Sequence, residues 1–187
     1  MARVRDLVLP AIERRGPIEA WIIDDTGFPK KGRHSVGVAR QYCGQLGKQD
    51  NCQVAVTLSI ANHSASLPIA CRLYLPLEWS ADAARRDKAG VPQEIGFATK
   101  PEIALSQIRA ACEGGVPRGV VLMDAGYGAD TGLRTELTCL GRHCQLKRPW
   151  YAPSVGGAAV RVGELLCSPI VLPRSSRAGP EKAPWLR

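Results

Sequence analysis

The sequence predicts an α/β fold in which helices flank a mixed β-sheet. Residues 52–62 and 67–76 are β-rich segments separated by a polar turn, which is the pattern of an antiparallel hairpin. Residues 99–115 have the clearest helical pattern, and the short apolar segment 119–128 follows, as in a strand reached through a crossover helix. A hairpin followed by such a crossover predicts a sheet with both antiparallel and parallel pairs.

The segments before the hairpin have weaker patterns. Residues 2–16 have apolar positions on one helical face, although Pro10 interrupts the pattern. Residues 19–25, with the sequence EAWIIDD, predict a strand that ends in two aspartates. Residues 28–51 are polar and rich in turn residues, so we expect a loop that holds only short strand pieces.

The segments after the hairpin are more sharply marked. Residues 77–98 are charged and contain Gly and Pro, which predicts a surface connection. Thr99 and Glu102 form a capping-box pattern at the start of the 99–115 helix. The 119–128 segment predicts a buried strand ending in an aspartate, and residues 130–141 predict a second helix.

The composition changes near residue 146. The last 41 residues hold six of the fourteen prolines, and seven Lys and Arg residues against two Asp and Glu. Their apolar periodicity fades, which is typical of a poorly ordered tail. The sequence therefore predicts a folded domain over residues 1–146 and a Pro/Arg-rich tail over 147–187.

The charge of the chain favours a polyanionic partner. The 187 residues carry a formal net charge of +8, which favours nucleic acid. The sequence has no apolar run of about eighteen residues, and its start has no signal-peptide pattern. We therefore expect a cytoplasmic protein without a membrane partner.

Asp25 and Asp124 occupy similar sequence contexts. Each follows an apolar segment predicted to be a strand, and each precedes a glycine-containing turn. If the two strands are neighbours, the carboxylates converge, and their repulsion then requires a cation or a shared proton. Hard oxygen ligands favour Mg²⁺ or Mn²⁺, which can clamp the oxygens of a phosphodiester. The alternative is that both residues are ordinary turn or N-cap aspartates.

A cluster of basic residues follows the first aspartate. Lys30, Lys31, Arg33 and His34 lie in a Gly/Pro-containing turn. Such residues can bind DNA phosphates near the metal ions. A solvated surface loop is an equally good interpretation of the same residues.

Two long stretches resemble insertion-sequence transposases of the DDE class, of the type-701 family. They are WIIDDTGFPKKGRHSVGVARQYCGQLGKQDN and VVLMDAGYGADTGLRTEL, and the resemblance extends over about residues 3–141. It implies a ribonuclease-H-like catalytic fold, with Asp25 and Asp124 as catalytic metal ligands for Mg²⁺ or Mn²⁺. It also implies cleavage of DNA at transposon ends, followed by transfer of the 3′ hydroxyl to target DNA.

The resemblance stops before the family's third carboxylate. The family places a glutamate on a late helix, and no residue of this chain matches it, because Glu136 comes too early and Glu164 lies in the unmatched tail. We therefore expect a catalytic domain that is incomplete at its C-terminal end and inactive alone. A frameshift that produced the tail is our hypothesis, and sequencing the locus tests it, since a second reading frame should then encode the glutamate helix.

Two alternatives to an enzyme remain open at this stage. The chain could be a non-catalytic DNA-binding remnant that uses its basic loop and tail, with a full-length transposase as a further partner. Salt-dependent DNA affinity that ignores both aspartates would favour this alternative. The chain could also be an unfolded pseudogene product, which a cooperative thermal transition would exclude.

Overall fold

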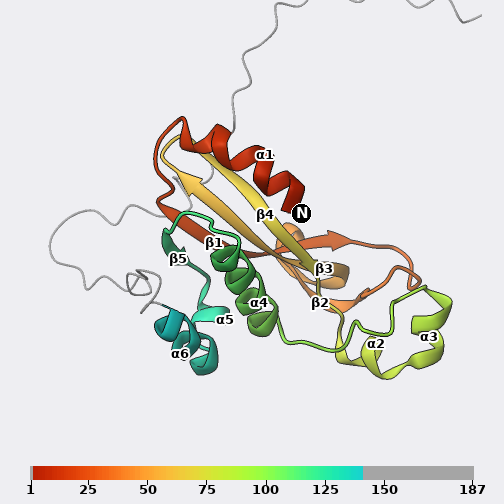
Figure 1. Cartoon of the computed structure of the whole chain (residues 1–187). Helices are drawn as coiled ribbons and strands as arrows, with labels where there is room; N and C mark the ends of the chain where they lie inside the picture. Colours follow the sequence, from red (N-terminus) through yellow and green to blue (C-terminus); the bar gives the residue numbers. More distant parts are fainter. Residues whose placement is uncertain (1, 141–187) are drawn as a thin grey trace, which may run out of the picture. The chain divides into compact units, whose positions relative to one another are not determined.

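A mixed β-sheet forms the centre of the described chain. The computed structural model of the protein describes residues 2–140. Within them, β1 (Ala20–Pro29) lies between β3 (Lys48–Asn62), to which it is antiparallel, and β5 (Val120–Leu122), to which it is parallel. β2 (Ala39–Cys43) and β4 (Ala65–Leu73) pair with β3 along its other edge (Figure 1). The predicted mixed sheet is confirmed.

The central strand pair has a continuous register and a buried face. β1 and β3 pair from Ala20 opposite Ala61 to Pro29 opposite Cys52. Val54, Val56, Leu58 and Ile60 alternate along β3 and are almost completely buried. Residues two apart share one face of a strand, so Val56, Leu58 and Ile60 line the main hydrophobic core, while Val54 packs in a smaller cluster with Cys43 and Cys52.

The first strand is longer than the sequence predicts. It continues through both aspartates to Pro29 instead of turning after Asp25. The strand stays paired with β3 as far as Pro29, and at Gly27 an added Cβ would come within 2.9 Å of the Cys43 sulfur. The glycine thus lets a neighbouring segment pack closely against the extended strand, and a turn is not required.

The segment predicted as a turn-rich loop, 28–51, holds more structure than expected. It contains β2, the short 3₁₀-helix η1 (Gly44–Leu46) and the first residues of β3. The hairpin of β3 and β4 is confirmed, with an irregularity in register where Ser59 faces Pro68. Proline cannot donate a ladder hydrogen bond, so a bulge at this point avoids a missing bond.

Three longer helices contribute to the hydrophobic core, and the first two contact the sheet while the third lies beside the second. These helices are α1 (Ala2–Glu13), α4 (Lys100–Glu113) and α6 (Thr131–Leu140), and their apolar residues join one core with β1 and β3 (Figure 1). The capping box of α4 is present, with Thr99 and Glu102 bonded reciprocally. In α1 only part of the predicted apolar face is used, because Ile12 is buried whereas Val4 and Leu7 are exposed.

The predicted surface connection is partly a packed substructure. It forms α2 (Leu77–Ala81) and α3 (Ala83–Lys88). Trp79 is wholly buried, its indole nitrogen donates to the Val38 carbonyl at 2.8 Å, and Arg85 lies 3.7 Å above its ring. The indole therefore fixes this connection to the segment before β2.

The chain after α4 enters the sheet only briefly. β5 has three residues, and a single turn of helix, α5 (Ala125–Gly128), follows it, so the predicted strand at 119–128 is too long. The predicted helix at 130–141 is confirmed as α6, with the Asp130 carboxylate bonded to the Leu133 amide at 2.7 Å.

None of the helices within residues 2–140 is long and apolar enough to cross a membrane. The prediction of a separate tail at 147–187 lies outside the described residues.

Gly119 directly precedes β5 and lies against the backbone at the start of β1. An added Cβ there would lie 2.7 Å from the Ala20 nitrogen, which is backbone and cannot rotate away. We predict that Gly119→Ala lowers the free energy of unfolding by about 1–3 kcal/mol, the usual cost of overpacking. Urea denaturation followed by circular dichroism measures this change.

Gly96→Ala is the matched control, because no atom lies within 4 Å of a Cβ at that position and its φ is not positive. Equal stability of the two variants would contradict the close approach of β5 to β1.

Candidate functional site

Asp25 lies on β1 just beyond the point where its parallel neighbour ends. The pairing with β5 stops at Ile22 and Leu122, and within residues 2–140 no strand pairs with this edge of β1 along the aspartates. Asp25 shares the buried face of β1 with Trp21 and Ile23, and its side chain is 28% exposed. The carboxylate therefore stands at the margin of the core, with α4 packed against the same face.

Asp24 lies next to Asp25 on the opposite face of β1. Its carboxylate accepts a hydrogen bond from the Asp25 amide at 2.8 Å, and its main-chain carbonyl accepts one from the Thr57 hydroxyl at 3.0 Å. Loss of water around the carboxyl group raises the pKa of Asp24, against the lowering effect of the Asp25 amide. The negative charges of Asp25 and Asp124 raise this pKa further.

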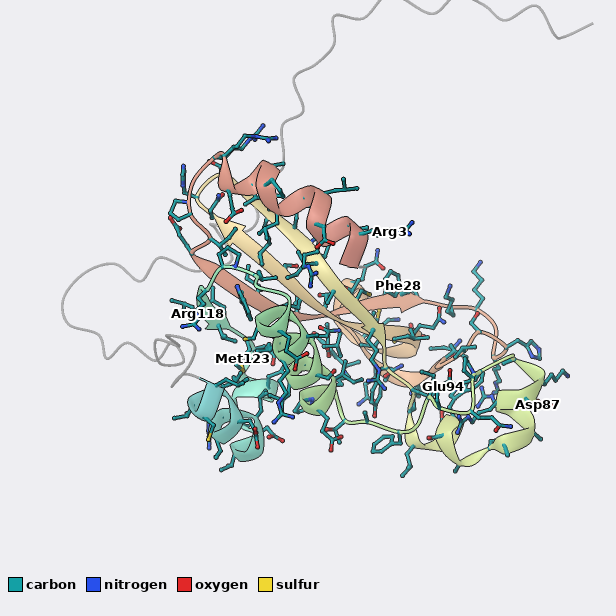
Figure 2. All side chains as sticks on the ribbon, in the orientation of Figure 1. Arg3, Phe28, Asp87, Glu94, Arg118 and Met123 are labelled. Carbon is teal, nitrogen blue, oxygen red and sulfur yellow. The ribbon has the colours of Figure 1, made fainter. Side chains whose placement is uncertain are left out.

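Asp124 follows β5 and begins the short helix α5. Its carboxylate accepts the Tyr127 amide at 3.0 Å, so it is an N-cap, as one interpretation of the sequence expected. In the parallel pairing, Ala20, Trp21 and Ile22 lie opposite Val120, Val121 and Leu122. If this pairing were extended by two residues, Asp24 would lie opposite Asp124. Figure 2 labels Met123, the residue that joins β5 to this aspartate.

Tyr127 connects the two predicted site aspartates. Its amide binds Asp124, and its hydroxyl donates to Asp25 Oδ1 at 2.5 Å. The residue is only 3% exposed, so it covers the core and its ring is not available for stacking on a base. Burial, followed by the hydrogen bond to Asp25, raises the pKa of the Tyr127 hydroxyl far above its ordinary value. The hydroxyl therefore remains a proton donor over the whole physiological range.

Lys100 is a site residue that the sequence did not reveal. Its ammonium lies 2.6 Å from Asp25 Oδ2, and its side chain is 30% exposed. Lys100 is the first residue of α4, directly after the Thr99 N-cap. The capping pattern in the sequence locates Lys100 at a helix start but does not indicate its contact with Asp25. The partnership with Asp25 depends on how α4 lies against β1, which local sequence does not determine.

The carboxylates fit part of a site for a divalent metal ion. Asp25 accepts one described donor on each oxygen, and a carboxylate offers about four lone-pair positions. Asp124 uses one oxygen for its cap. Oxygen ligands of this kind suit Mg²⁺ or Mn²⁺. Residues 2–140 contain no group of three or more His, Cys, Asp or Glu side chains arranged to hold a metal ion.

The predicted basic residues lie on an exposed loop beyond the end of β1. Lys30, Lys31, Arg33 and His34 are all exposed. Lys30 is five residues beyond Asp25 in an extended chain, which separates them by roughly 17 Å along the strand. The role of these residues in binding DNA phosphates stays a prediction.

The main chain of this basic loop is held by side chains outside it. The Asn51 amide donates to the carbonyls of Lys30 and Gly32, at 2.6 and 2.9 Å. Arg85 donates to the Arg33 carbonyl at 2.9 Å, and Gln53 to the Val36 carbonyl at 2.6 Å. The loop thus has a defined shape while its cationic side chains stay in solvent.

Comparison with known proteins identifies the class of protein. The sheet, with β1 between an antiparallel and a parallel neighbour and with helices against it, is ribonuclease-H-like. A family model described as DDE superfamily endonuclease matches residues 1–149, and the chain belongs to this family. No solved structure matches the chain.

The similarity extends to an insertion-sequence transposase. A probable transposase for insertion sequence element IS701 from Microchaete diplosiphon is 37% identical over 123 residues, or 66% of this chain. The chain thus belongs to the DDE superfamily endonucleases and is similar, over these residues, to an IS701 transposase. The matched residues span 29% of the length of that relative.

The raised pKa of Asp24 yields a test of the carboxylate arrangement. Because the folded pKa lies above the unfolded value of 3.8, the folded state binds more protons, and stability falls as pH rises through the folded pKa. We predict that Asp24→Asn increases the free energy of unfolding at pH 7. The gain should shrink as pH is lowered toward 3.8. Urea denaturation across this range measures it.

Asp87→Asn removes one negative charge from α3, away from the three carboxylates, and controls for net charge. A gain in the Asp24→Asn variant that is independent of pH would show that charge crowding at this site is not its cause.

Proposed function

We propose that Asp25 and Asp124 are the metal ligands of a DNA strand-cleavage and strand-transfer site. The observation that supports this proposal best is Tyr127, which binds one carboxylate with its amide and the other with its hydroxyl. A divalent metal ion bound there would polarise the phosphate and activate water or a 3′ hydroxyl. Mg²⁺ and Mn²⁺ both suit these ligands.

The residues of this chain would orient the metal ligands and the DNA. Tyr127 and Lys100 fix the position of Asp25, while the α5 cap fixes that of Asp124. In cleavage, an oxygen of water forms a bond to phosphorus, the bond to the 3′ oxygen breaks, and the 3′ oxygen takes a proton. In strand transfer, the 3′ hydroxyl attacks a phosphorus of the target DNA, the bond from that phosphorus to its own 3′ oxygen breaks, and that oxygen takes a proton.

The proposed site needs a third carboxylate from outside residues 2–140. A later part of a longer polypeptide could supply it, as could a full-length transposase in the same assembly. We therefore propose that the described domain binds metal ions weakly and is inactive, or nearly so, alone. Transposon ends and target DNA are the proposed substrates.

We propose that the basic loop contacts DNA phosphates some distance from the reacting phosphate. Its separation from Asp25, roughly 17 Å, corresponds to about five nucleotides at 3.4 Å per nucleotide of a strand. The anchored main chain supports this role, because side chains on a loop of fixed shape lose less entropy on binding.

The second candidate function is DNA binding without catalysis. The ion pair between Lys100 and Asp25 favours it, because the carboxylate already has a counter-ion without any metal. In this alternative the aspartates are structural, and the basic loop contributes the affinity for DNA.

The proposed metal site can be tested with Asp25→Asn and Asp124→Asn. Electron paramagnetic resonance of free Mn²⁺ measures binding to the purified chain, and supercoiled DNA with Mg²⁺ or Mn²⁺ reports nicking. We predict Mn²⁺ binding that each substitution weakens by about tenfold or more, because a divalent ion loses an anionic ligand. Any nicking by the chain should be lost in both variants.

Asp87→Asn again serves as the control with an equal charge change. Metal binding or nicking that persists in both site variants would overturn the proposed catalytic function. Unchanged DNA affinity together with an absence of Asp-dependent metal binding would establish the DNA-binding alternative.

The role of the basic loop can be tested separately with Lys30, Lys31 and Arg33 all replaced by Ala. The loop anchors reach main-chain carbonyls, so its shape should survive. We predict weaker DNA binding. The slope of log affinity against log salt concentration should decrease in magnitude by about two to three, since each phosphate contact contributes about 0.9 to it. Fluorescence anisotropy at several salt concentrations measures both quantities.

The matched variant replaces Arg14, Arg15 and Lys88 by Ala. It removes the same charge from residues outside the loop. An equal loss of salt dependence in this control would mean that the basic loop has no special role in DNA binding.

A further inference from the structure

The ammonium of Lys100 occupies one oxygen of the proposed metal ligand Asp25. Its nitrogen is 2.6 Å from Asp25 Oδ2, and both side chains are about one-third exposed or less. A metal ion would lie about 2.0–2.1 Å from a carboxylate oxygen and bring its own water molecules. The ammonium and a hydrated metal ion therefore compete for the same side of Asp25.

The electrostatic setting explains why a cation is needed there when no metal is bound. Asp24 is the chain neighbour of Asp25, and Tyr127 joins Asp25 to Asp124 through its hydroxyl and its amide. Like charges this close raise the free energy of the folded state unless a cation or a proton offsets them. Among the described residues, Lys100 is the cation that contacts Asp25 directly.

The main chain of Lys100 is fixed, whereas its side chain can move. The residue opens α4 between Thr99 and Pro101, and the capping box fixes this turn. Lysine carries its charge on a flexible four-carbon stem, unlike the rigid fork of arginine. The Tyr74 ring lies 5.6 Å from the ammonium and gives it a second favourable surface away from Asp25.

We propose that Lys100 is an internal counter-cation, which holds Asp25 until a divalent metal ion displaces it and then binds the DNA phosphate at that metal. This inference rests on the proposed metal site at Asp25 and Asp124. It assigns Lys100 a positioning role with two successive anionic partners, first the carboxylate and then the phosphate. Neither step changes a covalent bond.

Metal affinity distinguishes this role from a purely structural one. Removing a structural contact weakens a site, whereas removing a competing cation strengthens it. Lys100→Met should bind Mn²⁺ about tenfold more tightly than the unaltered chain, as measured by electron paramagnetic resonance. Lys100→Arg should bind no more tightly than the unaltered chain, because it keeps a cation near Asp25.

Two further variants complete the experiment. Lys100→Gln provides a polar side chain if the methionine variant does not fold, and the same increase in affinity is expected. Lys88→Met removes a lysine of α3 outside the site and should leave Mn²⁺ affinity unchanged.

DNA binding tests the second step. With Ca²⁺ present, Lys100→Met should reduce the slope of log affinity against log salt by about one, the contribution of one phosphate contact. Without a divalent ion, the slope should be unchanged, because the ammonium is then held by Asp25.

The outcomes separate this inference from the proposed function. Mn²⁺ binding that depends on Asp25 but is equal or weaker in Lys100→Met and Lys100→Gln would overturn the role of Lys100 alone. An absence of Asp25-dependent Mn²⁺ binding in every variant would overturn the metal site itself. If Lys100→Met reduces the slope of log DNA affinity against log salt equally with and without Ca²⁺, the metal ion does not displace Lys100 from Asp25, and the inference is overturned.

Discussion

The parallel pairing of β5 with β1 is the contact on which the candidate site depends. It involves only three residue pairs, Ala20–Ile22 with Val120–Leu122. Short as it is, it decides where the chain emerges after β5, and hence where Asp124 and Tyr127 lie. Gly119 makes the approach possible, because any side chain there would meet the β1 backbone. The site is thus a consequence of how closely two strands approach.

A buried phenol and a half-buried ammonium then hold the aspartates in place. Tyr127 belongs to the hydrophobic core, yet its hydroxyl reaches Asp25. This arrangement couples packing to electrostatics, because the ring cannot move without disturbing a core that also includes Ile23 and Val121. The carboxylates therefore have defined positions, which would reduce the reorganisation required to bind the proposed metal ion.

The sequence predicted those parts of the fold that depend on local patterns. Residues 52–62 alternate clearly, and Thr99 with Glu102 marks a helix start, so both elements were found. The length of β1 was missed because Gly27, read as a turn signal, instead allows close packing against Cys43. Local sequence cannot distinguish these two uses of glycine, since the deciding neighbour is sixteen residues away.

The site was only half predictable for a related reason. Asp25 and Asp124 each follow an apolar segment, which made them visible in the sequence. Lys100 lies 75 residues from Asp25, and only the placement of α4 against β1 brings the two together. The spacing along the chain between Asp25 and the basic loop likewise follows from the full length of β1. In this fold the chemistry of the site depends on strand lengths and helix placement as much as on residue types.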